Sequence, residues 1–307
     1  MSDELNVLHV FPHGLGDACQ FTAVIRHLAR FRPEWRTDII SDRGKHSAFA
    51  GLVHESLVDT TCAGTRRYDL TFMHEWPECA ECWADSSGTK TVRCLREVFD
   101  IRPQWDLLRY AVTVYDDAKS RVDDYIKELP DRKFVLIHYE GKTSTPYKNL
   151  PHDVVQQICE FLIGLNLVPV ILDWDSRSPI PDNKRVFCPD SANGLWMNTG
   201  TGDAELIAAL TGRAALFIGI DSGPQKVAFS TNTPTIAIWT EHHPYHYADN
   251  APNAVHLIPE NHADYLRGHR RDSGLEFFAK RYKSATYAKE ALAQSITKLA
   301  VQLLTQL

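Results

Sequence analysis

Residues 215–239 read ALFIGIDSGPQKVAFSTNTPTIAIW, and this stretch predicts a strand, a polar turn, a short helix and a second strand. Its two apolar ends have the composition of buried parallel strands. Between them, Ser222 or Gly223 can cap a helix whose first turn accommodates Pro224. Asp221 is therefore expected at the carboxyl end of a strand and beside a helix N-terminus, where open α/β sheets bind ligands. An ordinary corner between a strand and a helix, with a surface carboxylate, explains the same residues.

A second turn, near the N-terminus, favours the ligand-binding interpretation. Residues 13–17 read HGLGD, follow a predicted strand at 6–11 and precede a predicted helix. The glycines allow a tight turn, and the helix N-terminus can receive an anion or hold a carboxylate. The dinucleotide-binding pattern G-x-G-x-x-G is incomplete, because Cys19 occupies the place of the third glycine. Asp17 is therefore a candidate functional carboxylate, with a helix cap or dipole partner as the simpler alternative.

The composition is that of an ordinary globular chain of 307 residues, with 44% hydrophobic and 23% charged residues. The formal net charge of −6 argues against nucleic acid as a partner. No apolar run of about 18 residues is present, so we expect no transmembrane segment. The N-terminus carries acids where a signal peptide needs basic residues, and the odd number of cysteines argues against a secreted disulfide framework. These features predict a cytoplasmic protein, or one that associates peripherally with the inner membrane.

Strand and helix patterns alternate along the chain, which predicts an α/β fold with parallel sheets. Apolar runs that predict strands lie at residues 6–11, 37–41, 134–138, 168–172, 215–220, 235–239 and 254–258, with weaker candidates at 55–59, 68–72, 109–114 and 185–187. Amphipathic helices are expected between them, and a long helix is expected at 288–304. We therefore predict two Rossmann-like, doubly wound domains that face a central cleft, an N-terminal domain at 1–130 and a C-terminal domain at 131–307.

An irregular region at about 61–94 interrupts the predicted N-terminal domain and contains four of the seven cysteines. Their spacing, C-x16-C-x2-C-x11-C, suits a tetrahedral four-thiolate site for zinc or iron, formed by Cys62, Cys79, Cys82 and Cys94. His74 is a substitute ligand. Such a metal would be structural, because four thiolates leave no position open for a substrate. Reduced cysteines packed against the fold are the alternative.

Two further polar loops follow predicted strands. The first, at 141–151, carries hydroxyls and one ammonium, from Thr143, Ser144, Thr145 and Lys148. Together with backbone N–H groups, they can cradle a diphosphate without a metal, although a solvated loop explains them equally. The second loop begins at Thr240 and contains His242, His243 and His246. We expect these histidines to be hydrogen-bonding loop residues rather than metal ligands.

Three of these features together resemble the ADP-heptose:lipopolysaccharide heptosyltransferases of glycosyltransferase family 9. The glycine turn that ends at Asp17 is similar to the N-terminal G-D motif of that family. Residues 148–151, KNLP, are similar to its basic-residue, Trp, Pro segment, with Leu150 where tryptophan is usual. Residues 221–224, DSGP, followed by Pro-Thr at 234–235, resemble its signature D-[ST]-G…P-T, the most specific of the three. In order, the similarity covers most of the chain.

The resemblance implies a GT-B fold, a donor site mainly in the C-terminal domain and an acceptor site mainly in the N-terminal domain. It also implies inversion at the anomeric carbon without a catalytic metal. We assign Asp17 as the base that takes the proton of the acceptor hydroxyl. Asp221 would hold sugar hydroxyls, while Lys148, the 143–145 loop and the helix end at 222–223 would offset the charge of the leaving diphosphate. The full set of expected donor-binding residues is Gly16, Thr143, Ser144, Thr145, Lys148, Asp221, Ser222, Gly223 and Lys226.

Two features depart from the usual pattern of the family. Lys226 stands three residues after the signature glycine, where the family usually has histidine. The cysteine cluster is not general in the family, but it resembles the iron-binding cysteines of the bacterial autotransporter heptosyltransferases.

The predicted function is transfer of a sugar from a nucleotide-diphosphate sugar, ADP-heptose being the first choice, to a hydroxyl of a glycan, lipopolysaccharide or protein. A nucleotide-sugar epimerase of the same fold, which would need no acceptor, is one alternative. A non-catalytic sugar-binding protein, in which Lys226 marks an inactive donor site, is another. The missing third glycine disfavours a dinucleotide oxidoreductase.

Overall fold

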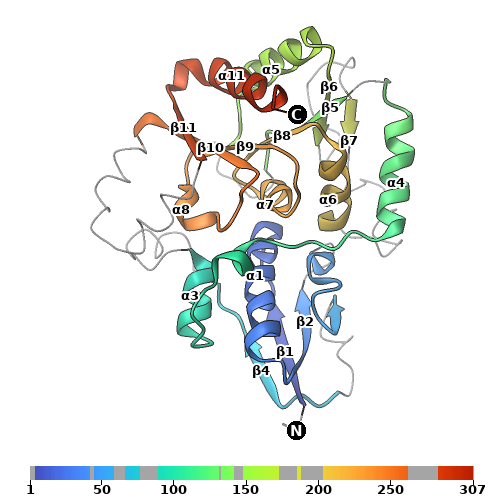
Figure 1. Ribbon diagram of the computed structural model, residues 1–307, viewed down its shortest axis with the longest axis vertical. Helices are drawn as coiled ribbons and strands as arrows, with labels where there is room; N and C mark the ends of the chain where they lie inside the picture. Colours follow the sequence, from blue (N-terminus) through green and yellow to red (C-terminus); the bar gives the residue numbers. More distant parts are fainter. Residues whose placement is uncertain are drawn as a thin grey trace.

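The structure is a computed structural model that describes residues 4–41, 45–58, 66–76, 89–130, 133–141, 148–172, 185–187, 203–261 and 283–306. Two parts, each built on a parallel sheet, are stacked along the long axis of the molecule (Figure 1). All described strands of the first sheet precede residue 74, and those of the second follow residue 133. The α/β class expected from the sequence is confirmed. Within the described ranges, no helix combines the length and hydrophobicity that a membrane span requires.

The first sheet has four parallel strands in the order β3-β2-β1-β4. They are β1 (Leu5–Phe11), β2 (Trp35–Ser41), β3 (Glu55–Leu57) and β4 (Leu70–Met73). Helix α1 (Leu15–Phe31) connects β1 to β2 and packs one apolar side into the core, because Phe21, Val24, Ile25 and Leu28 recur at helical spacing. β1 pairs with a strand on each side, so the start of α1, which follows the carboxyl end of β1, lies near the middle of the sheet.

The second sheet has seven parallel strands in the order β11-β10-β9-β8-β5-β6-β7. They are β5 (Phe134–His138), β6 (Val168–Leu172), β7 (Arg185–Phe187), β8 (Leu216–Ile220), β9 (Thr235–Ile238), β10 (Ala254–Pro259) and β11 (Lys283–Tyr287). The chain runs outward from β5 to β7 and then returns to β8 on the other side of β5. The carboxyl ends of β5 and β8 therefore form a topological switch point, the position where such sheets bind ligands. Asp221 directly follows β8 at this point.

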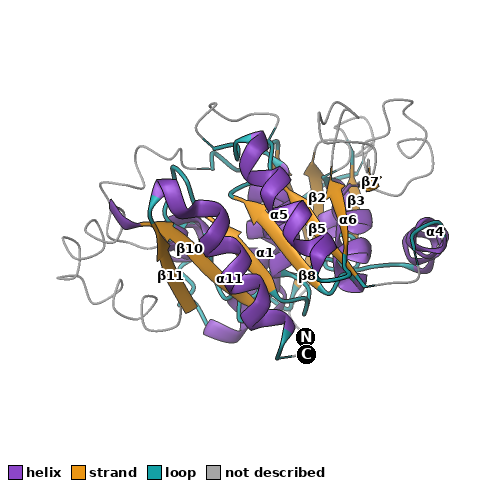
Figure 2. Ribbon diagram, turned by 90° about the horizontal axis from the view of Figure 1, so that it is seen from above, coloured by secondary structure: helices purple, strands orange, loops and turns teal. Residues whose placement is uncertain are grey.

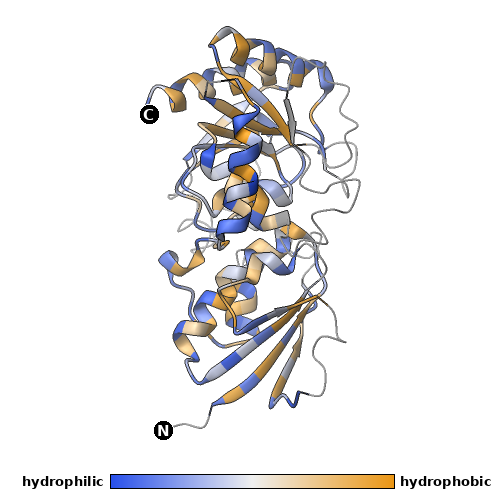
Figure 3. Cartoon of the chain, turned by 90° about the vertical axis from the view of Figure 1, so that its right-hand side faces the viewer, coloured by the Kyte–Doolittle hydropathy of each residue, from blue (hydrophilic) through white to orange (hydrophobic). Residues whose placement is uncertain are grey.

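Helices cover both faces of the second sheet (Figure 2). Helices α5 (His152–Gly164) and α11 (Leu292–Leu304) pack on one face, with Leu216, Ile218 and Ile220 of β8. Helices α6 (Asp203–Arg213) and α7 (Gly223–Phe229) pack on the other face, with Phe217. The alternation follows from the two-residue period of a strand. Strands buried on both faces need continuous apolar sequence, and these strands are mostly orange in Figure 3.

One hydrophobic core joins the two parts. It contains Phe11 and Phe21 from the first part, and Phe217 and Phe229 from the second. Around it lie η1 (His46–Phe49), α3 (Lys90–Glu97), η2 (Trp105–Leu108) and α4 (Asp116–Lys127). Helices α1 and α7 pack against each other across the junction of the two parts. The division of the chain at residue 130 stays a prediction.

The structure differs from the sequence-based expectation in several elements. Residues 109–114, expected as a weak strand, are not a strand, and Arg109 instead donates from Nη2 to the carbonyl of Thr231, 2.8 Å away. The segment is therefore an extended connection along the junction. β11 and the short helix α8 (Pro244–Tyr247) are additional elements. The strand expected at 185–187 is confirmed as β7, which pairs with β6.

Candidate active site

The two glycine turns expected to bind ligand lie against each other at the junction of the two sheets. A Cβ atom on Gly223 would lie 2.9 Å from the Cβ of Leu15, and one on Gly16 would lie 3.6 Å from the Cα of Gly223. At Gly223 any larger residue would displace α1 from α7, so glycine is required for this approach. Asp17 and Asp221, which follow strands of different sheets, are thereby brought to the same region. Figure 1 shows α7 directly above the start of α1.

Asp17 lies in the first turn of α1, and 29% of its side chain is exposed. Gly14, not Asp17, occupies the N-cap position of this helix. The carboxylate accepts a hydrogen bond from the ammonium of Lys90, with 3.0 Å between Nζ and Oδ1. An acid in the first turn also interacts favourably with the helix dipole. Asp17 is thus a partly exposed carboxylate that is held by a lysine from α3.

Asp221 is surrounded by cationic groups at the switch point. Its Oδ1 accepts a hydrogen bond from Nζ of Lys226 at 2.7 Å, and its Oδ2 lies 2.6 Å from Nδ1 of His242. Nζ of Lys148 lies 3.9 Å from the same Oδ2. Burial opposes the charged form, but Lys226, His242 and Lys148 outweigh it and hold the pKa of Asp221 well below its usual range. Asp221 is therefore an ionised carboxylate that orients two lysine ammonium groups and the His242 imidazole.

Lys226 is the most enclosed of these cations, with 4% of its side chain exposed. Its ammonium lies 4.3 Å from the centre of the Trp239 ring and also donates to Oε1 of Gln225 at 3.1 Å. Burial lowers the pKa of Lys226, and the Asp221 carboxylate opposes that loss of charge. The contact with the indole face is a cation–π interaction. Lys226 therefore contacts Asp221 from the buried side of the site. Lys148, with 21% of its side chain exposed, is the more solvent-exposed of the two lysines.

Two residues of this region had little signal in the sequence. Lys90 comes from the cysteine-rich region, and only its place in the first turn of a helix, where the dipole disfavours a cation, distinguishes it. His242 forms the loop hydrogen bond that the sequence predicts, and the structure identifies Asp221 as its partner. Its position just after β9, beside β8 in the sheet, could have suggested that pairing. Ser222 lies with Oγ 3.0 Å from Nδ1 of His138 at the end of β5.

Several predicted site residues lie outside the described part of the chain, namely Thr143, Ser144, Thr145, Cys62, Cys79 and Cys82. Cys94 is described, and burial raises the pKa of its thiol to about 12. His74, the substitute ligand, is buried with its Nε2 2.8 Å from Nδ1 of His9. No group of three or more potential ligands from His, Cys, Asp and Glu is placed to hold a metal among the described residues. The metal site therefore stays a prediction.

The charges at the junction favour an anionic ligand. Three ammonium groups, those of Lys90, Lys148 and Lys226, lie in this region with two carboxylates, those of Asp17 and Asp221. His242 adds a further group that can carry positive charge. Fixed cations can stabilise a diphosphate and the charge that gathers on it as it leaves.

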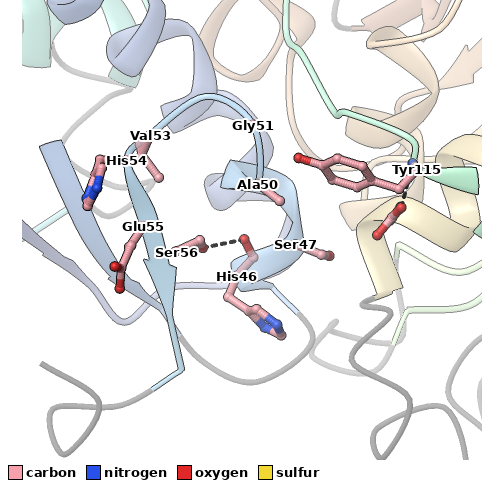
Figure 4. A pocket seen from close by; sticks show the side chains of 10 residues that line it. His46, Ser47, Ala50, Gly51, Val53, His54, Glu55, Ser56 and Tyr115 are labelled. Atoms are coloured by element: carbon pink, nitrogen blue, oxygen red, sulfur yellow. Dashed lines mark hydrogen bonds between the residues drawn. The ribbon is translucent and has the colours of Figure 1, made fainter. Parts of the chain in front are cut away.

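A separate pocket of about 380 Å³ lies between the first part of the molecule and α6 (Figure 4). The η1–β3 segment forms one wall, and Tyr115 with Glu205 forms the other. Glu205 accepts a hydrogen bond from the backbone N–H of Tyr115 at 2.7 Å, and burial raises the pKa of its carboxyl. Glu55, on the opposite wall, is paired with Arg66, whose Nη1 is 2.7 Å from Oε2. The described lining residues include no lysine or arginine, so this pocket is less suited to an anion than the junction is.

Comparison with known structures places the fold. The crystal structure of a glycosyltransferase family 9 protein from Veillonella parvula superposes with a TM-score of 0.70 and 13% identity, and covers 100% of this chain and 99% of its own. ADP-heptose lipopolysaccharide heptosyltransferase II of Escherichia coli superposes with a TM-score of 0.64 and 12% identity, and the match covers 98% of this chain and 99% of the other. TibC, a dodecameric iron-containing heptosyltransferase of enterotoxigenic E. coli solved with ADP-D-β-D-heptose, superposes with a TM-score of 0.55 and 14% identity. That match covers 83% of this chain and 62% of TibC. The fold is therefore GT-B, two parallel-sheet units that face each other.

The sequence comparison matches a family model to part of the chain. Residues 202–271, which include the Asp221 turn, match the sequence model of glycosyltransferase family 9 (heptosyltransferase). No curated protein matches the chain in sequence. The resemblance to glycosyltransferase family 9, seen first in the glycine turns, is confirmed for residues 202–271 in sequence and for the whole chain in fold.

Proposed function

We propose that the protein transfers a heptose from ADP-heptose to a hydroxyl acceptor, with inversion at the anomeric carbon. One observation carries the proposal: the turn that bears Asp17 and the turn that bears Asp221 meet through Gly16 and Gly223. This arrangement places a partly exposed carboxylate beside a cluster of cations. A sugar bound between them would have a base on one side and a stabilised leaving group on the other.

The cations would receive the donor diphosphate. Lys148 is exposed to solvent on one side and held near Asp221 on the other, so it can turn toward a phosphate. Asp221 fixes Lys226 and His242, which limits the reorganisation needed when charge develops on the leaving group. E. coli heptosyltransferase II is named for ADP-heptose, and TibC was solved in complex with ADP-D-β-D-heptose, which supports the choice of the same donor here. Asp221 can still accept from sugar hydroxyls, because a carboxylate has about four lone-pair sites.

Asp17 would act on the acceptor. In a single displacement, the acceptor hydroxyl attacks the anomeric carbon opposite the leaving diphosphate and must lose its proton as it does so. The carboxylate of Asp17 comes from the first sheet, while the cations around Asp221 come from the second. Base and leaving-group site thus belong to opposite walls, as inversion requires. No metal is needed for these steps, since lysine side chains supply the positive charge.

The pocket in Figure 4 supports a neutral sugar as the acceptor rather than a phosphorylated one. Its lining offers hydroxyls from Ser47 and Tyr115 and the carboxyl of Glu205. Such groups exchange hydrogen bonds with sugar hydroxyls, whereas carboxylates repel an anion. Ala50 and Val53 add an apolar surface for the C–H face of a ring. We propose that one ring of the acceptor glycan binds there.

The cysteine cluster is proposed as a structural zinc or iron site. TibC, which has a similar fold, is described as iron-containing, and this supports a metal site in the present protein. Purified protein would carry about one zinc or iron ion per chain if the four thiolates bind one metal. Elemental analysis that finds neither metal would leave the cysteines as reduced thiols.

The test of the function is a panel of nucleotide sugars read first by thermal shift and then by turnover. ADP-heptose should raise the melting temperature more than UDP- or GDP-sugars, because a ligand that binds only the folded state stabilises it. Turnover should then require a hydroxyl acceptor. Release of an epimerised sugar nucleotide without acceptor would identify an epimerase instead. Donor binding without turnover for any acceptor would identify a sugar-binding protein.

A further inference from the structure

Lys90 occupies a place that local helix stability does not explain. It is the first residue of α3, and its side chain is 7% exposed. A cation at a helix N-terminus is disfavoured by the dipole, and the first turn of α3 contains no acid to offset it. Its aliphatic stem is enclosed, and its ammonium lies 5.4 Å from the centre of the Tyr247 ring. A buried lysine at such a position is expected to have a specific partner.

That partner is Asp17, the proposed base. Nζ of Lys90 lies 3.0 Å from Oδ1 of Asp17, which is hydrogen-bond distance. The charged and titratable groups that act on this carboxylate from the neighbouring described elements are Lys90 on α3 and Lys226 on α7, with the neutral thiol of Cys19 on its own helix. Lys226 is hydrogen-bonded to Asp221, so among the residues that the structure describes Lys90 is the cation that contacts Asp17 directly.

Lys90 is itself held in place by Asp249, which belongs to the loop between α8 and β10. Asp249 is fully buried and accepts hydrogen bonds from both residues that flank Lys90, from Thr89 and, at 2.6 Å, from Thr91. Thr89 is also the N-cap of α3, with 3.3 Å between its Oγ1 and the backbone nitrogen of Val92. The first turn of α3 is therefore fastened to the second part of the molecule.

We propose that Lys90 is a positioning residue for Asp17, and that Asp249 sets the place of Lys90 through Thr89 and Thr91. The proposal rests on the function of Asp17 as base. Lys90 fixes the rotamer of the Asp17 carboxylate through its hydrogen bond to Oδ1, and this leaves the second carboxylate oxygen for the acceptor hydroxyl. Because Asp249 comes from the donor-binding part, the base is held in place only when the two parts are in contact. Donor half and acceptor base are thus coupled through two threonine hydroxyls.

The geometry predicts a loss in the chemical step with little change in donor binding. A misplacement of about 1 Å in a reacting group can lower a rate by about a hundredfold. Lys90→Met keeps the length and apolar stem but removes the ammonium, and it should lower the single-turnover rate by about tenfold to a hundredfold. Lys90→Arg, which restores the cation, should recover part of the rate. Lys119→Met, which removes a surface ion pair with Asp116, is the matched control and should leave the rate unchanged.

A double-mutant cycle tests the link through Asp249. Thr91→Val removes one hydroxyl with little change of shape, and it should also slow the chemical step. In the Lys90→Met background the same change should have almost no further effect on rate, because the positioned group is already gone. Additive losses would mean that Thr91 does not act through Lys90.

The decisive experiment measures single-turnover transfer and donor dissociation constants for these variants and for Asp17→Asn. A fall in rate at unchanged donor affinity, partly restored by arginine, supports positioning. A raised donor dissociation constant for Lys90→Met would make Lys90 a donor ligand, and a full rate with a lowered melting temperature would make it structural. Both outcomes overturn the inference. If Asp17→Asn keeps the wild-type rate, the assignment of the base fails instead, and the two failures are distinguished.

Discussion

At the scale of single residues, Lys148 and Lys226 have different tasks although both are lysines near Asp221. Lys226 is enclosed by Trp239 and bonded to Asp221, so its charge is already used inside the protein. Lys148 is 3.9 Å from the carboxylate and partly open to solvent. The cation most able to bind an incoming phosphate is therefore Lys148.

We predict that Lys148→Ala weakens the binding of ADP or ADP-sugar by about tenfold or more, because a hydrogen bond to a charged group contributes about 1.5–3 kcal/mol. The fold should be preserved, since the side chain is partly exposed and Asp221 keeps its two closer partners. Calorimetric titration measures the affinity, with Lys119→Ala as the surface control. An unchanged dissociation constant would remove Lys148 from the donor site.

The role of Asp17 can be separated from donor binding. We predict that Asp17→Asn lowers single-turnover transfer at saturating substrates by at least about a hundredfold, since general-base assistance typically contributes about 10²–10⁴ in rate. Donor affinity should stay nearly intact. If the variant transfers sugar within about tenfold of the wild-type rate, the base lies elsewhere.

At the scale of elements, the meeting of α1 and α7 depends on the absence of a side chain at Gly223. A methyl group there would lie 2.9 Å from the Cβ of Leu15, a contact that requires the helices to move apart. Gly212, in α6, has no heavy atom within 4 Å of the equivalent position. Packing against Leu15 therefore requires glycine at position 223, whereas the glycine at position 212 has no packing role and only weakens its helix.

We predict opposite effects for the two alanine substitutions. Gly223→Ala should lower the free energy of unfolding by about 1–3 kcal/mol through overpacking and should also reduce transfer. Gly212→Ala should raise it by up to about 1 kcal/mol, because alanine favours a helix more than glycine does. Urea unfolding of both variants measures the difference. Equal effects would mean that the approach of α1 and α7 is not limited by Gly223.

The elements that the sequence reveals are those whose residues are buried. Residues 215–220 and 134–138 lie in the middle of a sheet covered on both faces, so their apolar runs are unambiguous. β11 is an edge strand with the polar sequence KSATY, and it exists because β10 offers backbone groups to pair with. Its tertiary pairing, not its composition, makes it a strand.

The candidate site shows the same limit. Asp17 and Asp221 follow recognisable glycine turns, and the sequence therefore selects them. Lys90 comes close to Asp17 only through folding, because its helix is fastened by Asp249, a residue more than a hundred positions away. Contacts that depend on two distant segments leave no local pattern, and Lys90 could not be predicted.

At the scale of the whole molecule, Asp249 links stability to pH. Burial raises the pKa of its carboxyl from 3.8 to about 6, although Thr89, Thr91 and Tyr110 oppose the shift. The folded state thus binds this proton more tightly than the unfolded state. Between about pH 4 and pH 6 the contribution of Asp249 to stability falls as pH rises, because the folded protein must then carry a buried charge.

We predict that Asp249→Asn gains stability relative to wild type as pH rises from about 4 to about 7. The change over this range should not exceed about 3 kcal/mol, since one pKa unit corresponds to about 1.4 kcal/mol. Urea titrations at several pH values give the difference. Asp116→Asn, at a carboxylate that is 99% exposed, is the control and should show no such trend. A difference that is flat with pH would show that Asp249 does not ionise in this range.

The core that passes from Phe11 and Phe21 to Phe217 and Phe229 also limits how substrates can reach the proposed site. A hinge motion that separated the two sheets would expose these aromatic rings to water, which costs about 25 cal/mol of free energy for each Å² of apolar surface. Substrates are therefore expected to enter and leave through local rearrangement of the rim, with the two sheets staying docked. X-ray scattering in solution should give the same radius of gyration with and without bound nucleotide, whereas a hinged transferase would contract.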